Sequence, residues 1–376
     1  MTVLAATDAA VGCWLAKRFR QSCWRGASEP PAMRNSVSAR GVFWDSGGHG
    51  EKSGSRGTAS DPFWARVREL EHTPGRHVRR QHLVSKVLLK RFTAPGSGGA
   101  GPQLYPFDLR HPHQSHKLKG PAGCGWAENF VSFASGTLED LWARTEQDLP
   151  GAFRALDAGR ILDEVEHHAL LRDFLALHWV RSYFYRDAFD RIFTEFRARS
   201  RHWFLTDGRD LVRTAALQEC GLHIAGLEGL QHMVDDLLRP TDELFPNGAL
   251  MRIHMEEMFN KVRDRISAAG LQIHPPESGE FLIGDTPAQT IRFDHGHPIW
   301  GVAIRDAASM IIPLGPKHLL SLGRESTLRV MSNDDREAMN RVQILSAVRY
   351  VYYRPQSGLE RTVLGALKAH GAGQFQ

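Results

Sequence analysis

The chain has 376 residues, of which 42% are hydrophobic and 24% are charged, and it carries a formal net charge of +5. A chain of this length can bury a substantial apolar core in one large domain or two smaller ones, without disulfides or a structural metal. Its four cysteines show neither a CxxC pair nor zinc-ligand spacing, and no apolar run approaches the roughly 20 residues that span a bilayer. We therefore expect a cytoplasmic protein, and not a disulfide scaffold, a zinc-finger protein or a membrane-spanning protein.

The positive charge is concentrated toward the N-terminus. Residues 72–127 hold nine Lys or Arg and one acidic residue, Asp108, whereas the rest of the chain after residue 60 is acidic on balance. One interpretation is a face that binds nucleic acid or another polyanion. The other is a solvated surface whose charges pair within the protein.

Residues 1–60 have the composition of a linker. They are rich in Gly, Ser and Arg, most clearly at 46–50 and 53–57. We expect either a disordered leader or an over-called start, with translation beginning later, for instance at Met33; an Arg-rich, acid-poor transit peptide is a third interpretation. The excess of Arg over Lys is typical of GC-rich coding sequence and favours a bacterial protein.

The ordered part is predicted to begin with a helix at 61–72, followed by a basic, apolar stretch at 81–92. Apolar residues recur at helical spacing in this stretch, and His82, Lys86 and Lys90 lie four residues apart on another face. We expect one face to pack on the core and the basic face to remain accessible.

A strand is predicted next, at 103–108. Its apolar residues include Pro106, which cannot donate a hydrogen bond to a neighbouring strand. The strand should therefore lie at a sheet edge or contain a bulge.

A helix is predicted at 137–149, with Thr137 as its cap. At about 100° per residue, Trp142 falls in an apolar stripe, and Glu139 and Glu146 fall at the edge of the same stripe. Carboxylates in that position are half-buried, so we expect them to have polar partners or shifted pKa values.

A long amphipathic helical region is predicted at 161–199, and Arg181 lies in the middle of its apolar face. A guanidinium keeps its proton and needs a carboxylate partner when buried, and Glu139 and Glu146 are the nearest logical candidates. Two interpretations remain open. The cluster is either a buried salt bridge that fixes how the helices pair, or a substrate or metal pocket in the helix interface.

Further helices are predicted at 208–219, 223–238 and 247–269. The pattern then changes to short apolar runs separated by Pro, Gly and Asp turns, which is typical of strands, over 271–323. A closing helix is predicted at 334–352, with Arg349 in its apolar face and a cap from Ser332 or Asn333. The Gly-rich residues 356–376 are expected to be a tail.

These elements predict an α+β fold that is mostly α-helical, with a small, mostly antiparallel sheet in the C-terminal half. A single domain is expected over 61–355. It would consist of the basic module 72–127, a helical body 137–269, the strand-rich part 271–323 and the closing helix.

Several motifs follow one another in order along this domain. They are a His-led segment at 82–92, an aromatic strand ending in Asp108, Leu138-Glu139 followed by Glu146, a helical Arg181, a turn at 281–287, a Pro-Leu-Gly-Pro turn at 313–316, and a late helix with Asn340 and Arg349. In this order they resemble DUF4238, a bacterial family of domains of unknown function. The resemblance spans about 77–355 and implies a shared fold without implying a particular activity.

Two positions depart from that family pattern. Ser85 stands where the family has a proline, which should change little because serine also starts helices. Thr286 stands where the family has an asparagine after Asp285, which removes an amide from the turn. If that amide contacts a ligand in relatives, the site is altered in this chain.

The leading functional hypothesis is a hydrolase or nuclease-like enzyme that acts on a polyanionic or phosphate-containing substrate. Its predicted residues are His82, Glu139, Glu146 and Asp285 for catalysis, and Arg181, Asn340 and Arg349 for substrate binding. Paired carboxylates could hold a divalent cation or act as acid and base, a histidine could carry a proton, and arginines could hold a phosphate or a carboxylate. The basic residues of 72–127 would then attract the polyanion.

The alternative hypothesis is a binding or regulatory module without catalytic activity, for example in a phage-defence or toxin system. In that case the Glu–Arg pairs only hold helices together. The two hypotheses differ in a structural respect. Polar groups of a binding module satisfy one another with no cavity beside them, whereas a catalytic pocket brings its groups together where a substrate can reach them.

Overall fold

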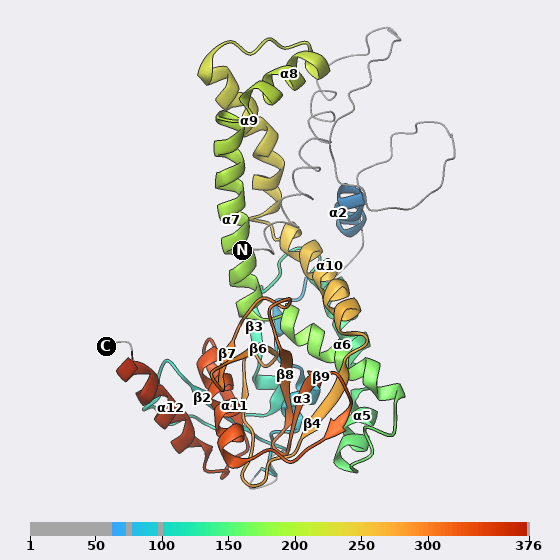
Figure 1. The fold of residues 1–376 in the computed structure, drawn as a ribbon, viewed down its shortest axis with the longest axis vertical. Helices are drawn as coiled ribbons and strands as arrows, with labels where there is room; N and C mark the ends of the chain where they lie inside the picture. Colours follow the sequence, from blue (N-terminus) through green and yellow to red (C-terminus); the bar gives the residue numbers. More distant parts are fainter. Residues whose placement is uncertain (1–61, 73–76, 97–100, 374–376) are drawn as a thin grey trace. The chain divides into compact units, whose positions relative to one another are not determined.

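The computed structural model describes residues 62–72, 77–96 and 101–373 (Figure 1). The expectations for residues 1–60 lie outside this part of the chain. Within it the fold is α+β and mostly helical, as predicted. None of the described helices is long and apolar enough to cross a membrane.

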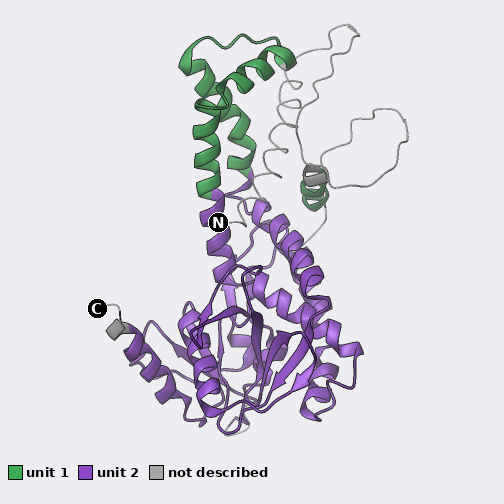
Figure 2. Cartoon of the chain, in the orientation of Figure 1, with its two compact units in different colours: residues 1–72, 194–243 green, residues 73–193, 244–376 purple. Residues whose placement is uncertain are grey.

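The chain divides into two compact units, which Figure 2 shows in different colours. The larger unit comprises residues 73–193 and 244–376, and it contains every residue predicted for the site. The smaller unit comprises residues 1–72 and 194–243. Residues 194–243 of the smaller unit are therefore inserted within the sequence of the larger unit. The helical periodicity over 61–355 does not indicate this division.

The inserted part of the smaller unit is a helical hairpin with its own core. Its described helices are the last part of α7 (Tyr183–Leu205), α8 (Arg209–Cys220) and most of α9 (Gly226–Leu244). Apolar side chains from all three, including Phe204, Val212 and Val234, pack together. Ion pairs join α7 to α9, because Arg197 lies 2.5 Å from Asp242 and Arg201 lies 2.8 Å from Asp235. The smaller unit also contains α2 (Pro62–His72).

The helical body of the larger unit has more breaks than predicted. It consists of α4 (Ser135–Glu146), α5 (Leu149–Asp157), α6 (Glu166–Val180), the first part of α7, and α10 (Ala249–Ile266). The predicted cap of α4 is wrong. Ala134, in the left-handed region with φ 46°, occupies the cap position, and the Thr137 hydroxyl donates to the Ala134 carbonyl at 2.8 Å.

The helical region predicted as continuous over 161–199 is divided at Arg181. This residue leaves the helical conformation, with φ −94° and ψ 41°. The Ser182 hydroxyl then accepts a hydrogen bond from the Tyr185 N–H at 3.1 Å, which satisfies a donor in the first turn of α7. Serine favours helix starts for this reason, and the break follows directly after the arginine that the pattern placed in the apolar face.

The strands form three sheets among the described residues. They are β1 (Arg80–His82), β2 (Tyr105–Asp108), β3 (Trp126–Glu128), β4 (Gly270–His274), β5 (Ile283–Gly284), β6 (Gln289–Asp294), β7 (His297–Trp300), β8 (Ser309–Gly315), β9 (His318–Gly323), β10 (Thr327–Leu328) and β11 (Tyr350–Tyr353). The largest sheet has the order β10-β4-β9-β8-β6-β7 and is antiparallel except between β10 and β4. The predicted antiparallel sheet in the C-terminal half is therefore present.

The two smaller sheets join distant parts of the chain. One has the order β2-β11-β5, so Pro106 lies on an edge strand, as predicted. The other pairs β1 with β3, which places His82 opposite Trp126. A single 3₁₀ turn, η2 (Pro121–Gly123), precedes β3, and the short helix α3 (Lys86–Lys90) follows β1. His82 is thus on a strand rather than on the helical face predicted for it.

The closing helix predicted at 334–352 is shorter. It is α11 (Asn333–Ser346), and the Ser332 hydroxyl caps it by accepting from the Asp335 N–H at 3.2 Å, as expected. Arg349 therefore precedes strand β11 and does not lie in the helix. The reason is that β11 pairs with β2 and β5 and buries Val351, Tyr352 and Tyr353, an arrangement that local helical spacing cannot reveal.

Residues 356–376, expected to be a tail, contain helix α12 (Leu359–Gly373). Leu359 and Val363, four residues apart on one face, are buried against Val351 and Phe107. The apolar face is thus sufficient to hold this helix against the small sheet despite its glycines.

The main apolar core lies between the helical body and the six-stranded sheet. Its side chains come from α3, α4, α6 and α10 on one side and from β4, β8 and β9 on the other. Residues 83–92 are part of this core, with Leu88, Leu89 and Phe92 fully buried. The segment that precedes them, including His82, is thereby held against the ends of α4 and α6.

Candidate functional site

The site is built on the turn between β1 and α3. The backbone N–H groups of Leu83 and Val84 both donate to the Gly125 carbonyl, at 2.7 and 3.0 Å. Gly125 has φ 67°, and a Cβ at this position would lie 2.8 Å from Leu89 Cδ1, so the close approach requires glycine. The Ser85 hydroxyl caps α3. The backbone of the turn is therefore fixed from both sides.

Arg181 is the buried centre of the arrangement, with 2% of its surface exposed. One of its Nη atoms donates to Glu146 Oε1 at 2.6 Å, and its Nε donates to the Leu83 carbonyl at 3.1 Å. The guanidinium also lies 5.0 Å from the centre of the Trp142 ring. The predicted pairing of Arg181 with Glu146 is thus present, and it joins α6 to α4 and to the turn.

Two residues that the sequence did not assign to the site complete this network. The Ser85 hydroxyl donates to Glu146 Oε2 at 2.8 Å, and the Ser85 N–H donates to His178 Nε2 at 3.1 Å. His178 Nδ1 lies 3.0 Å from the Phe174 carbonyl, which fixes the ring with Nδ1 protonated. The sequence did contain an indication, since His178 precedes Arg181 by one helical turn.

His82 lies beside this network with an altered pKa. Its pKa is lowered from 6.5 to about 4, chiefly by burial and in addition by Lys86 and Arg181, while Glu146 and a backbone hydrogen bond with Ala122 oppose the shift. Its Nε2 is buried and has no hydrogen-bond partner among the described residues. At neutral pH the imidazole is therefore uncharged.

Glu139 has the opposite shift. Its pKa is raised from 4.5 to about 7, chiefly by burial and in addition by like-charge repulsion from Glu146, while Arg181 opposes the shift. Its Oε1 is also buried without a hydrogen-bond partner in the described part of the chain. Glu139 therefore gains and loses its proton close to neutral pH.

We refer to His82, Lys86, Glu139, Glu146 and Arg181 as the helix-interface cluster. Each of the two shifted groups feels the charges of the other three members, so the cluster is electrostatically connected. Lys86 is exposed, whereas His82 and both glutamates are partly buried. The arrangement can exchange protons at neutral pH while Arg181 balances the charge of Glu146.

A divalent cation would find few ligands in this cluster. Both oxygens of Glu146 already accept hydrogen bonds, from Arg181 and Ser85. Only Glu139 and His82 remain as possible ligands. Mg²⁺ or Ca²⁺ sites with several carboxylates offer more protein ligands than these two.

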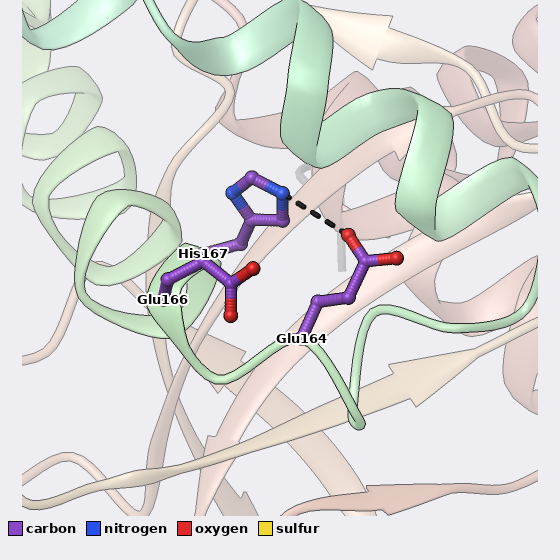
Figure 3. A group of neighbouring side chains, drawn as sticks. All are labelled: Glu164, Glu166 and His167. Atoms are coloured by element: carbon purple, nitrogen blue, oxygen red, sulfur yellow. Dashed lines mark ion pairs between the residues drawn. The ribbon is translucent and has the colours of Figure 1, made fainter.

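Elsewhere, among the described residues, Glu164, Glu166 and His167 place their ligand atoms within 4.8 Å of one another (Figure 3). Glu164 pairs with His167 at 3.3 Å, drawn as the dashed line, and with Arg160, also at 3.3 Å. Glu166 is exposed at the start of α6, where an acidic residue is favourable without any ion.

Asp285 and Arg349 form a second group. The Asp285 carboxylate accepts backbone hydrogen bonds from Val348, Arg349 and Tyr350, at 2.8 to 3.0 Å. Burial raises its pKa, and these backbone bonds oppose the shift. The Arg349 side chain donates through Nε and Nη2 to Asp108, at 3.1 and 3.0 Å. Asp285 thus positions the start of β11.

Asn340 belongs to neither group. It is fully buried on α11, its Oδ1 accepts from the Leu282 N–H and its Nδ2 donates to the Glu280 carbonyl, both at 3.0 Å. Both ends of the amide are therefore used to attach α11 to the segment before β5.

The basic module is partly neutralised by the rest of the larger unit. Arg91 makes two hydrogen bonds to Asp157, at 2.8 and 2.6 Å, and Arg79 pairs with Glu128 at 3.0 Å. Other cations of the module are exposed: Arg80, Lys86, Lys90, Arg110, Lys117 and Lys119. Internal pairing therefore explains some of the basic residues and leaves others accessible.

Comparison with known proteins identifies the family but no activity. Residues 80–357 match the model of a family described as "Protein of unknown function (DUF4238)". No curated protein and no solved structure matches the chain. Because the match covers most of the chain and includes both residue groups described above, the chain belongs to the DUF4238 family.

Proposed function

We propose that the helix-interface cluster is the acid–base centre of a hydrolase or nuclease-like enzyme of the bacterial cytoplasm, acting on a phosphate-containing or polyanionic substrate. The observation that carries this proposal is a pair of buried atoms in one connected cluster, His82 Nε2 and Glu139 Oε1, which have no hydrogen-bond partner among the residues that the structure describes. Buried polar atoms normally have partners, so two such atoms in one cluster indicate a place for a substrate or an attacking water.

The shifted pKa values assign different tasks to the two residues. With a pKa of about 7, Glu139 can act as a general base when ionised and as a general acid when protonated, at the pH where both forms are populated. His82, with a pKa of about 4, stays uncharged and would orient a water by accepting its hydrogen bond at Nε2. Their surroundings have shifted the pKa values of Glu139 and His82 in opposite directions, as expected of an acid–base site.

The cations of the cluster would act on the substrate in different ways. Lys86 is exposed and can contact a phosphate oxygen as a mobile point charge. Arg181 is buried and bonded to Glu146 and Leu83, so its task is to hold Glu146 and the turn in place. The exposed cations of 72–127 would attract a polyanion over a longer distance.

A binding module remains the second candidate, and the smaller unit supplies the observation in its favour. Leu211, Leu217, Leu222 and Leu227 are each at least half exposed on or between α8 and α9. Exposed leucines close together in sequence are typical of surfaces that bind protein partners. This candidate needs no chemistry from Glu139 or His82.

The test is an assay of the full chain against bis(p-nitrophenyl) phosphate and short single-stranded DNA and RNA, with and without Mg²⁺ or Mn²⁺. We expect turnover that Glu139→Gln reduces by about 10²-fold or more, the usual contribution of general acid–base catalysis. Asp140→Asn, at an exposed neighbour on the same helix, is the matched control and should retain full turnover. Absence of turnover, or turnover that Glu139→Gln leaves unchanged, would contradict the proposal.

A further inference from the structure

A small pocket lies beside the helix-interface cluster, bounded by β3, the start of α7 and β11. It encloses about 50 Å³, and its lining includes Trp126, Tyr183, Asp285, Arg349, Tyr350 and Tyr352. We refer to it as the Arg349 pocket. By the same measure a single water needs about 10–15 Å³, so the pocket has room for a compact group such as phosphate or carboxylate but not for a whole nucleotide.

The cationic donor of the pocket, Arg349, is held by Asp108 and lies 4.8 Å from the centre of the Tyr350 ring. Nε and Nη2 of Arg349 bond Asp108, and its Nη1 has no hydrogen-bond partner within the described residues. Its side chain is 44% exposed, in contrast to the buried Arg181. The guanidinium is thus oriented by Asp108 and still offers a charged donor.

Hydroxyl groups supply further donors. The Tyr352 oxygen accepts from the Gly125 N–H at 3.0 Å, which leaves its own proton free to donate. The Tyr350 hydroxyl is bonded to Asp108, whereas the Tyr183 hydroxyl, whose pKa burial raises, keeps its proton at neutral pH. One guanidinium and two hydroxyl donors around a small volume are groups that bind a tetrahedral oxyanion.

One acidic side chain also lines the pocket. Asp285 is engaged by three backbone N–H groups at the start of β11, which stabilise its charge and direct its oxygens toward the backbone. The charges that act on the Tyr183 hydroxyl are mixed, because Asp285 and Asp187 raise its pKa whereas Arg186 and Arg110 lower it. The preference for an anion therefore comes from the hydrogen-bond donors of the pocket, since the Asp285 oxygens already accept backbone hydrogen bonds.

The surroundings point to nucleic acid as the source of the anion. The Arg80 guanidinium lies 4.4 Å from the centre of the Trp126 ring, so the edge of the pocket combines an exposed cation with an aromatic surface. Sites for single-stranded nucleic acid combine these two features, with bases on aromatic rings and phosphates on cations. Arg110 extends the positive charge along the same basic module.

We propose that the Arg349 pocket binds the terminal phosphate of a single-stranded nucleic acid whose adjoining base lies against Trp126. This inference rests on the proposed function, since it names the substrate class of the same enzyme. The two sites share Leu83, which lines the pocket and whose carbonyl accepts a hydrogen bond from Arg181. A strand bound by its end in the pocket therefore lies beside the helix-interface cluster.

The experiment is calorimetric titration of the full chain carrying Glu139→Gln, so that bound strands are not turned over. The probes are a short oligothymidylate with a 5′-phosphate, the same strand with a 3′-phosphate, the unphosphorylated strand, inorganic phosphate and acetate. We expect one phosphorylated end to bind about tenfold more tightly than the unphosphorylated strand, which is the size of one or two charge-assisted hydrogen bonds. Acetate and inorganic phosphate should bind far more weakly than that strand.

Two variants locate the effect. Tyr183→Phe removes one hydroxyl from the pocket and should weaken binding of the phosphorylated strand about fivefold while leaving the unphosphorylated strand unchanged. Arg79→Gln is the matched control, because Arg79 is an exposed cation of the same module that pairs with Glu128 and does not line the pocket. It should change the affinity of both strands by the same small factor.

Equal affinity for phosphorylated and unphosphorylated strands, or no effect of Tyr183→Phe, overturns the inference. Binding of acetate or free phosphate as tight as that of the strand overturns the assignment to nucleic acid. These outcomes are separate from the failure of the proposed function. If the wild-type chain turns over substrate but shows no preference for a phosphorylated strand end, only the inference about the Arg349 pocket is contradicted. If the chain prefers a phosphorylated end but shows no turnover, only the proposed acid–base centre is contradicted.

Discussion

A free glutamate side chain loses its proton at a lower pH than a free histidine does, and the helix-interface cluster reverses this order. The pKa of Glu139 is raised to about 7 and that of His82 is lowered to about 4. In both cases burial is the largest cause, because it disfavours the charged form of either group. The nearby charges then modify the two values without reversing their direction.

This shift in Glu139 predicts a stability that depends on pH. Its folded pKa of about 7 lies above the ordinary value of 4.5, so the folded state binds the proton more tightly between these values, and the free energy of unfolding falls as pH rises through that window. Glu139→Gln removes the ionisation. The variant should melt near the wild-type temperature at pH 4 and above it at pH 8, by differential scanning calorimetry. An equal difference at both pH values, or the same pattern in Asp140→Asn, would contradict the assignment.

Arg181 tests whether the Glu–Arg pair holds the two helices together. Arg181→Met leaves Glu146 partly buried beside an apolar side chain and should reduce the free energy of unfolding by about 3 kcal/mol. Adding Glu146→Leu to this variant should recover part of the loss, because the unpaired carboxylate is then gone. Urea denaturation of the two single variants and the double variant measures this coupling, and strictly additive losses would show that the pair does not interact.

At the scale of elements, the turn between η2 and β3 connects the helix-interface cluster to the Arg349 pocket. The Gly125 carbonyl fixes the start of α3, its N–H bonds Tyr352, and its φ of 67° lies in the region that favours glycine. Gly125 therefore determines the spacing of α3, β3 and β11.

Gly125→Ala should be more harmful than the same change at a similar glycine elsewhere. Gly159 has φ 73° with nothing within 4 Å of an added Cβ, whereas at Gly125 that atom would lie 2.8 Å from Leu89. Both variants lose about 1 kcal/mol from the left-handed backbone, and Gly125→Ala loses a further 1–3 kcal/mol, approximately, from overpacking. Thermal unfolding of the two variants gives the comparison. Equal losses would mean that the surroundings of Gly125 can relax.

Elements that depend on local spacing could be predicted, and those that depend on distant pairing could not. Helical periodicity placed Arg181 on the inner face and Glu146 at its edge, and their contact follows from that pattern. Strand β11 exists because it pairs with β2, with Tyr350 opposite Asp108 far earlier in the chain, and no local pattern distinguishes Tyr350–Tyr353 from the end of a helix. For the same reason Arg349 was expected on α11.

The candidate site shows the same limit. His82, Glu139, Glu146 and Arg181 are brought together. Helical spacing was sufficient to name the two glutamates and Arg181, whereas His82 lies on strand β1 and not on the helical face predicted for it. Asp285 forms a group with Arg349 instead, because its carboxylate is bonded by the backbone before β11. The partnership of Ser85 with Glu146 was not foreseen, since it depends on the exact position of the β1–α3 turn.

At the scale of the whole molecule, the inserted helical hairpin should be separable from the larger unit. Its ends are close together, because Arg197 on α7 contacts Asp242 on α9, and it has its own apolar core. Replacing residues 194–243 with a short Gly-Ser linker should leave a chain that unfolds cooperatively, as insertions with adjoining ends generally allow. Circular dichroism during heating tests this, and a shortened chain without a cooperative transition would show that the larger unit needs the hairpin.

The central claim is that Glu139 titrates near neutral pH inside the helix-interface cluster. The most direct measurement is a ¹³C NMR titration of the full chain with labelled glutamate side-chain carboxyls, in which Glu139→Gln identifies the resonance by its disappearance. The structure predicts a midpoint at a pH of about 7, displaced upward from the ordinary value of 4.5. A midpoint near 4.5 would mean that Glu139 is simply ionised at neutral pH, and the proposed acid–base centre would be wrong.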